Sequence, residues 1–385
     1  MEKFSAYRDP GTGIQPFLTP IPPLGSDLLA KVTLPLRYTL GIVRTTLILF
    51  LALVYVTLIE GLCLILLPIP SLYRIVVHIF TYIIGRTILL ILGIFWIQVE
   101  QFNRKRGFVE EFSVKQVPTW NPKAGDIIVS NWASWIDIVW LAIRFNPIFV
   151  LPVPEFLPET PATPRASTPV MNTPGRRTGT GSANIQVPSR ATVPRIPIGG
   201  FRQVSLVSLI NYTGHVPPYG SARPGSKSLT LEELRRRSSR PIIIFPECTT
   251  SNGRGLLRFC DVFLQNVPVK DYQVFIMSIR YDPPTDLAPT LTHTIPSTFL
   301  NPLPHVFSLT TSLSLAQLSI RRLAPSESPG SRLFITSEVL SDYAGEDPLS
   351  ETCASLVAQM GKLKRTGLGW EDKSNFLQFY RGKKK

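Results

Sequence analysis

Two long apolar runs near the amino terminus dominate the hydropathy pattern of the chain. Residues 46–67, TLILFLALVYVTLIEGLCLILL, hold 18 apolar side chains in 22 positions, close to the ~20 residues needed to cross a hydrocarbon core. Each Leu, Ile, Val or Phe favours insertion by roughly 0.3–0.6 kcal/mol and one central charge costs about 2.5–3.5 kcal/mol. The apolar side chains therefore outweigh Glu60 severalfold, and we expect this run to enter a membrane.

A second apolar run covers residues 75–97 and carries His78 and Arg86. It fits a second span, one arm of a re-entrant hairpin or an interfacial helix. Prolines 68 and 70 separate the two runs, because proline ends a helix. Basic residues lie mainly outside the pair, so the positive-inside tendency predicts that both ends face the cytosol. They are Lys31, Arg37 and Arg44 before it, Arg104, Lys105 and Arg106 after it, and only Arg74 in the connector.

The remainder of the chain alternates between strand-like and helix-like segments, which is typical of an α/β domain. The expected strands are residues 127–130, 241–245, 272–281 and 332–340, and the expected helices are residues 134–145, 229–237, 309–322 and 349–364. Thr230 and Glu233 have the spacing of a capping box at the start of one helix. We therefore expect an α/β fold: a membrane-anchoring amino-terminal helical hairpin followed by a mixed sheet flanked by helices.

A segment rich in Pro, Thr, Ser, Gly and Arg interrupts this domain at residues 155–196. It has almost no large apolar side chains to offset the entropy of ordering, so we expect it to be disordered. Its four Thr-Pro pairs are potential phosphorylation sites, although a passive insertion is the favoured interpretation. The expected organisation is a cytosolic segment (1–38), a membrane hairpin (39–98), an α/β domain (99–154 and 197–385) and the insertion (155–196).

Charge and cysteine usage narrow the class of protein. Forty Lys and Arg against 26 Asp and Glu give a net charge of +14, which suits an anionic membrane surface, a phosphorylated substrate or nucleic acid. The apolar amino-terminal third favours the membrane, and we expect no nucleic-acid partner. The four cysteines show no C-x-x-C pair and no histidine at ligand spacing, so neither a disulfide framework nor a metal site is predicted.

The first candidate site is Asn131-Trp-Ala-Ser-Trp-Ile-Asp137, which follows the expected strand 127–130. Ser134 and Asp137 lie three residues apart at the start of a helix. This spacing is that of a capping box, in which the serine caps backbone N–H groups and the carboxylate complements the helix dipole. A catalytic carboxylate is the alternative.

The second candidate site is Phe245-Pro-Glu-Cys-Thr-Thr-Ser-Asn-Gly-Arg254, which follows the expected strand 241–245. Small hydroxyl residues followed by Asn-Gly-Arg can surround a phosphate with backbone N–H groups and a guanidinium. A simple Asn-Gly turn with a capping glutamate is the alternative. The candidate phosphate-binding residues are Glu247, Thr249, Thr250, Ser251, Asn252, Gly253 and Arg254, with Arg254 the strongest.

Together the two segments resemble the first and third motifs of the phospholipid/glycerol acyltransferase family, N-H-x-S-x-x-D and F-P-E-G-T. The resemblance covers roughly residues 120–280, and residues 198–202 and 274–281 stand where the second and fourth motifs lie. The ends, MEKFSAYRDPGTGIQPFL and WEDKSNFLQFYRGKKK, resemble a fungal branch, the lysophosphatidic acid:oleoyl-CoA acyltransferases, also known as a vacuolar protein sorting group.

This resemblance implies a glycerolipid-acyltransferase-like fold and transfer of an acyl chain, oleoyl in that branch, from acyl-CoA to lysophosphatidic acid or a related lysophospholipid. The product is phosphatidic acid, at the endoplasmic reticulum membrane and lipid droplets, with the catalytic domain facing the cytosol. Acyl-CoA serves as co-substrate, membrane lipids are the further partners, and no separate cofactor is implied. The sequence does not specify the acyl chain, the lysolipid or the oligomeric state.

The chain departs from the family pattern at two positions. Trp132 stands where the family has its catalytic histidine, and indole donates a hydrogen bond but accepts no proton. Cys248 replaces the motif glycine, which predicts an altered loop backbone. None of the four histidines has an aspartate five residues further on, so no shifted copy of the motif exists.

Two other groups are candidates for the general base. Asp137, with its pKa raised in a dry pocket, is one, and His215 folding into the site is the other. Losing a positioned base removes typically about 10²–10⁴-fold in rate, whereas positioning of the hydroxyl still supplies roughly 7–11 kcal/mol. We therefore expect a slow enzyme with Asp137, Ser134 and Asn131 in its site. A non-catalytic lipid-binding protein and a trafficking scaffold are the alternatives.

Overall fold

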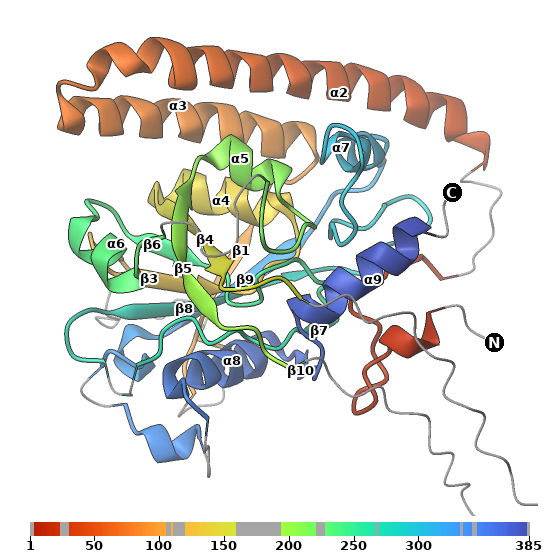
Figure 1. Cartoon of the computed structure of the whole chain (residues 1–385). Coiled ribbons are helices and arrows are strands. Elements are labelled where there is room, and N and C mark those ends of the chain that lie inside the picture. The colour runs from red at the N-terminus through yellow and green to blue at the C-terminus, as the bar shows by residue number, and fades with distance from the viewer. Residues whose placement is uncertain are drawn as a thin grey trace, which may run out of the picture.

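The structure, a computed structural model, describes residues 4–23, 31–104, 109–110, 120–158, 194–220, 228–265, 267, 269–331, 334–340 and 345–382. Its centre is an eight-stranded mixed sheet with the order β2-β1-β9-β8-β3-β6-β4-β5 (Figure 1). The strands are β1 (Gln98–Phe102), β2 (Val109–Glu110), β3 (Ile127–Ser130), β4 (Ile148–Pro154), β5 (Ile198–Val204), β6 (Ile242–Ile244), β8 (Val274–Tyr281) and β9 (Leu318–Leu323). A small parallel pair, β7 (Gly255–Leu256) and β10 (Lys364–Arg365), lies beside it.

The parallel strands β8, β3, β6 and β4 form the centre of the sheet, and the first three match predicted strands. Ile127 pairs with Ile242 on one side and Val274 on the other. Every residue of β3 and β6 is buried because helices cover both faces. On one face lie α4 (Trp135–Phe145), α5 (Leu206–Asn211) and α7 (Leu303–Thr310), and on the other lies α8 (Pro348–Gly361) (Figure 1).

Two capping boxes confirm helix starts that the sequence predicted. In α4, Ser134 Oγ accepts the N–H of Ile136 at 3.3 Å while Asp137 Oδ2 accepts the N–H of Ser134 at 2.9 Å. In α6 (Leu231–Arg237), Thr230 and Glu233 exchange hydrogen bonds of 3.0 and 3.3 Å in the same way. Each box satisfies backbone donors that the first turn leaves unpaired.

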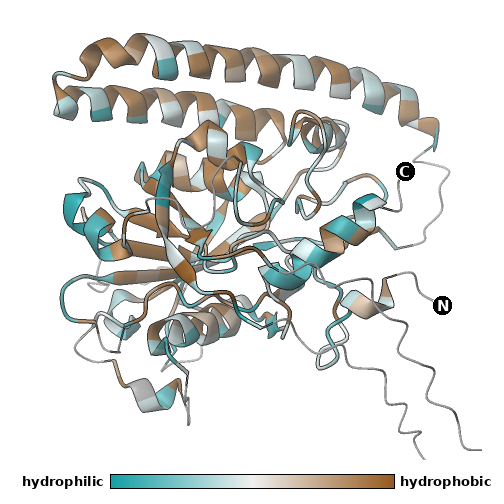
Figure 2. Cartoon of the chain, in the orientation of Figure 1, coloured by the Kyte–Doolittle hydropathy of each residue, from teal (hydrophilic) through white to brown (hydrophobic). Residues whose placement is uncertain are grey.

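The amino-terminal hairpin begins with α2 (Leu34–Tyr55), continues through a π-helical turn (Val56–Gly61) and a 3-10 turn (Leu62–Leu66), and returns as α3 (Pro70–Ile91). Both arms are long and apolar enough to cross a membrane. They lie flat along the domain, with α3 packed on α4 and α2 packed on α7 (Figures 1 and 2). At Gly85 a Cβ atom would come within 2.9 Å of Ile143, so the close approach of α3 to α4 requires glycine.

Two sequence predictions are wrong. Residues 309–322 do not form one helix, because α7 ends at Thr310 and β9 begins at Leu318. β9 lies in the sheet between β1 and β8, and its apolar residues Leu318, Ile320 and Leu323 are buried. The expected strand 332–340 instead contains the short 3-10 helix Thr336–Glu338 in its described part.

Two further 3-10 turns cover Ser5–Tyr7 and Pro325–Glu327.

The two ends of the described chain pack against each other, which the sequence analysis did not predict. Helix α9 (Trp370–Gly382) places Phe376 between Tyr7 and Phe17, with ring centroids 5.2 and 5.6 Å away. Asp9 Oδ1 accepts the N–H of Gly367 at 2.8 Å. Thus residues 4–19 belong to the folded domain. The Thr-Pro pairs of the insertion, its Arg165, Arg176 and Arg177, and the last three lysines lie outside the described residues. The end of the expected insertion is ordered, because Arg195 pairs with Asp261 at 2.7 Å and Ile196 is buried.

Candidate active site

The two motif segments leave neighbouring parallel strands at the same edge of the sheet. β3 leads into residues 131–137 and β6 leads into residues 245–254, and Val129 pairs with Ile244 at the end of the ladder. The carboxyl edge of parallel strands is where α/β folds most often place ligand sites. The segments also touch, because the N–H of Ser251 donates to the carbonyl of Trp132 at 3.0 Å. The two motif segments are therefore adjacent in the fold.

Glu247 links the two segments from a fully buried position. Its Oε2 accepts the N–H of Trp132 at 2.7 Å and its Oε1 accepts the N–H of Leu257 at 2.8 Å. Burial raises the pKa of Glu247 to about 8, although the two backbone donors and nearby Lys373 act in the opposite direction. Both carboxylate oxygens are thus engaged with the protein's own backbone.

Asp137 is buried and accepts three hydrogen bonds. The N–H groups of Ala133 and Ser134 donate to Oδ2 at 2.8 and 2.9 Å, and the hydroxyl of Tyr281 donates to Oδ1. Burial raises the pKa of Asp137 to about 6, against the opposing effect of these donors. Asn131 has a role in the sheet, since its side-chain amide exchanges hydrogen bonds of 2.9 and 2.8 Å with the backbone of Ile279.

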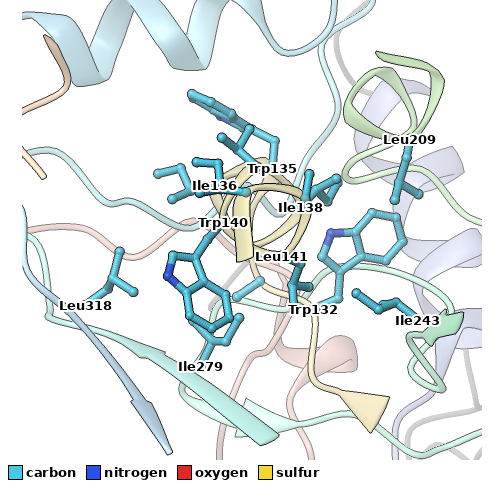
Figure 3. Packing of buried hydrophobic residues seen from close by; sticks show 14 of the residues in the cluster. Trp132, Trp135, Ile136, Ile138, Trp140, Leu141, Leu209, Ile243, Ile279 and Leu318 are labelled. Atoms are coloured by element: carbon cyan, nitrogen blue, oxygen red, sulfur yellow. The ribbon is translucent and has the colours of Figure 1, made fainter. Parts of the chain in front are cut away.

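Trp132 occupies the interior of the site with its indole ring. The side chain has no solvent exposure and stacks on Phe245, with ring centroids 4.9 Å apart and planes 23° apart. Figure 3 shows the indole beside Leu209 and Ile243 in the core. Its Nε1 has no hydrogen-bond partner in the part of the chain that the structure describes. The ring therefore fills space and takes no part in a polar network.

The hydroxyl residues of the second motif are also engaged internally. Thr249 Oγ1 donates to the carbonyl of His215 at 2.7 Å, and Thr250 Oγ1 donates to the carbonyl of His293 at 2.6 Å. Ser251 Oγ accepts the N–H of Gly253 at 3.3 Å. These side chains connect the loop to its neighbours, whereas a phosphate site would leave donors directed outward.

Asn252 connects the loop to the amino-terminal segment. Its Nδ2 donates to the carbonyls of Gln15 and Leu18 at 2.8 and 3.1 Å. Arg254, the strongest predicted phosphate contact, has an exposed side chain at the end of the loop. Cys248 has φ of 56°, in the region that favours glycine. The motif glycine of the family would adopt this conformation without strain.

Lys373, which was not among the predicted site residues, reaches the same loop from α9. Its fully buried Nζ donates to Thr249 Oγ1 at 2.8 Å and to the carbonyl of Thr250 at 2.7 Å. Burial lowers the pKa of Lys373 well below its usual range, with Glu247 opposing that shift. More than a hundred residues separate Lys373 from the loop, so no local spacing indicates this contact.

Two histidines lie beside the first motif in the fold. The N–H of His293 donates to the carbonyl of Ala133 at 2.8 Å, and the His293 and His305 rings are 4.7 Å apart. His305 Nδ1 accepts the Trp135 indole N–H at 3.0 Å, so the ring carries its proton on Nε2, which faces the carbonyl of Thr290. Burial lowers the pKa of His293 to about 3 and that of His305 to about 4.

His215, the alternative base, is half-buried and contacts the second motif through its carbonyl oxygen. Burial, Arg381 and Lys373 lower its pKa to about 4, so the imidazole is neutral at pH 7. Among the described residues, no group of three or more His, Cys, Asp or Glu side chains could hold a metal ion.

Comparisons of this chain with protein-family models, with curated proteins and with solved structures give no match. The family fold and activity therefore remain predictions from the motifs. Physically, the site is a closed, preorganised junction in which the side chains of Asn131, Trp132, Ser134, Asp137 and Glu247 are at most 1% exposed. A substrate reaches these groups only if a surrounding loop moves.

Proposed function

We propose that the protein is a membrane-bound acyltransferase that transfers an acyl chain from acyl-CoA to lysophosphatidic acid or a related lysophospholipid. The observation that carries the proposal is the junction of the two motif segments at the carboxyl edge of β3 and β6. Glu247 fixes this junction through the N–H of Trp132 at 2.7 Å. This contact joins residues 115 positions apart and so brings the two segments together, which supports the resemblance to the family motifs.

In the proposed reaction, a hydroxyl of the lysolipid attacks the thioester carbonyl and forms the new ester. The carbon–sulfur bond breaks, CoA leaves as its thiol, and a base transfers the hydroxyl proton. Asp137 is the candidate base, because a pKa of about 6 leaves it ionised at neutral pH and basic enough to accept a proton. The exposed Arg254 is the candidate contact for the lysolipid phosphate.

The membrane setting follows from the hairpin. Its outward side presents large apolar side chains to the surroundings, and α2 and α3 lie along the domain (Figure 2). We propose that this side enters the cytosolic face of the endoplasmic reticulum and of lipid droplets, where the lysolipid substrate resides. Strongly exposed examples are Ile42, Val43, Phe50, Leu53, Ile65 and Ile75.

A non-catalytic lipid-binding protein is the second candidate, and the Trp132 indole favours it. The ring is fully buried, stacks on Phe245 and has no group able to accept a proton. A protein that retained the fold but no longer catalysed the reaction would tolerate such a replacement, because packing alone would maintain the junction.

The test is product formation by the purified full-length protein in detergent with labelled oleoyl-CoA and lysophosphatidate. Asp137→Asn removes the candidate base, and Arg236→Gln, on the exposed surface of α6, is the matched control for purification and stability. We expect slow turnover that Asp137→Asn abolishes and Arg236→Gln leaves unchanged. No turnover by a sample that still binds acyl-CoA would support the second candidate.

A further inference from the structure

A cavity of about 620 Å³ separates the tip of the hairpin from the sheet domain. Its volume falls within the roughly 300–1,000 Å³ of typical small-molecule sites. Tyr55, Ile59 and Glu60 form part of the hairpin wall, and Phe149 and Arg240 form part of the domain wall. The cavity therefore lies where a membrane-embedded element meets the folded domain.

This cavity is distinct from the motif junction. Arg240 precedes β6 and Ile148 begins β4, so the cavity is at the amino edge of the parallel strands. Asn146, which ends α4, lines it as well. The 11 residues of α4 separate the two sites by about 16 Å. A ligand here has no contact with the groups proposed for acyl transfer.

Arg240 is a partly buried cation without an anionic partner. Its Nη1 donates to Asn146 Oδ1 at 2.8 Å, and no carboxylate of a described residue lies within 4.0 Å of the guanidinium. Burial lowers the pKa of Arg240, and the positive charge of Arg74 acts in the same direction. An anion bound beside this guanidinium would compensate the lost hydration.

Glu60 provides the opposite charge from the hairpin wall. It lies in the π-helical turn Val56–Gly61, at the point where the hydrogen-bonding pattern of the first arm changes. Such turns are frequent at functional sites. No basic side chain of the described chain forms an ion pair with Glu60. The cavity thus holds one cation and one carboxylate that do not pair with each other.

The rest of the lining favours an amphiphile that carries both charges. Tyr55 and Tyr73 line the same wall as Glu60, and aromatic residues are suitable neighbours for an ammonium group. Ile59, Leu64, Val77 and Phe149 provide apolar surface for methylene groups. A purely anionic lipid would meet repulsion from Glu60, and free phosphate would leave the apolar surface uncovered.

We propose that this cavity binds the headgroup of a zwitterionic glycerophospholipid, with its phosphate beside Arg240 and its ammonium group beside Glu60. The surrounding membrane supplies the lipid, and its chains extend along the hairpin. Because the site is separate from the motif junction, the proposal holds whether or not the protein transfers acyl chains.

The test measures binding of a fluorescent lysophosphatidylcholine to the full-length protein in a non-ionic detergent, by anisotropy. Unlabelled lysophosphatidylcholine, lysophosphatidic acid with the same chain, and inorganic phosphate are the competitors. We expect the zwitterionic lipid to compete at least tenfold better than lysophosphatidic acid and phosphate to have no effect. Equal or better competition by lysophosphatidic acid would overturn the assignment of a zwitterionic ligand.

Variants locate the ligand in the cavity. Glu60→Gln should weaken lysophosphatidylcholine about tenfold and strengthen lysophosphatidic acid, whereas Arg240→Gln should weaken both. Gln203→Trp, at an exposed position in the lining, should block the cavity and abolish binding. Arg236→Gln, on the exposed face of α6, is the matched charge control and should leave both affinities unchanged.

Thermal unfolding separates binding effects from loss of fold. If Arg240→Gln unfolds, Arg240→Lys keeps the charge and should retain the preference for lysophosphatidylcholine, and Glu60→Gln still decides the ammonium contact. Unchanged affinity in a folded Gln203→Trp variant would place the ligand elsewhere and overturn the proposal. So would a Glu60→Gln variant with the affinities of the unmodified protein.

Discussion

Replacing Trp132 by histidine tests directly whether the motif junction lacks only a base. The indole is fully buried and stacks on Phe245 at 4.9 Å. A buried tryptophan covers about 150–250 Å². Losing roughly 100 Å² of that contact costs about 2.5 kcal/mol at 25 cal/mol per Å². No hydrogen bond is lost, because Nε1 has no partner among the described residues, and the backbone N–H still reaches Glu247.

The expected effect on the reaction is larger than the loss of stability. Histidine at position 132 recreates the N-H-x-S-x-x-D pattern with Asp137 already positioned by the N–H groups of Ala133 and Ser134. In the buried pocket the imidazole would be neutral at pH 7, the form that accepts a proton. A positioned general base contributes typically about 10²–10⁴-fold, so Trp132→His should raise the initial rate of phosphatidate formation by at least about a hundredfold.

Trp132→Phe is the matched control, since it keeps an aromatic ring beside Phe245 and supplies no base. The two variants are compared by initial rates with labelled oleoyl-CoA and lysophosphatidate, at a temperature well below both unfolding midpoints. Adding Asp137→Asn to the histidine variant should remove the gain. Equal rates for Trp132→His and Trp132→Phe would refute the idea that a stronger base at position 132 completes this junction.

Three further predictions concern stability, each measured by thermal unfolding. Burial raises the pKa of Glu247 to about 8, so its contribution to the free energy of unfolding falls as the pH rises from the pKa of an unfolded glutamate to about 8. Burial lowers the pKa of Lys373, so its contribution to the free energy of unfolding grows as the pH rises towards the pKa of an unfolded lysine. The two groups act in opposite directions between pH 6.5 and 8, so Glu247→Gln should gain stability over that interval, while Lys373→Met should lose about 2 kcal/mol. If the stability of both variants changed in the same direction between pH 6.5 and 8, this prediction would be wrong. Asn252→Ala should cost about 2 kcal/mol and expose residues 10–20 to protease, because it removes the hydrogen bonds to Gln15 and Leu18. Gly85→Val should cost about 1–3 kcal/mol through its clash with Ile143, whereas Gly61→Ala, with open space around its Cα, should cost far less.

The centre of the fold was predictable because its signals are local. Residues 127–129 and 241–245 are continuous apolar runs and residues 272–281 are mostly apolar, and a strand buried on both faces has that pattern. The capping boxes at Ser134 and Thr230 also depend only on near neighbours. The prediction failed at 309–322, where apolar side chains fit both periodicities and pairing with β1 and β8 selects the strand.

The site was predictable only in its position. Two motifs that follow parallel neighbouring strands must meet at the carboxyl edge, and they do. The roles of the side chains depend on partners far away in sequence, such as Ile279 for Asn131 and Lys373 for Thr249. No periodicity or spacing encodes those pairs. The packing of α9 on the amino-terminal segment escaped the analysis for the same reason.

The hydrogen bonds of the motif side chains explain how the junction keeps its form without the family histidine. Asn131, Asp137 and Glu247 all bind backbone N–H groups, and none of them depends on the side chain at position 132. Only packing constrains that position, so an indole can replace an imidazole while the loops stay in place. The motif pattern therefore indicates how the two loops are held together more strongly than it indicates catalysis. For that reason product formation by the purified protein, and not the motif itself, decides between enzyme and lipid-binding protein, and the histidine and phenylalanine variants show whether a base at position 132 adds to the rate.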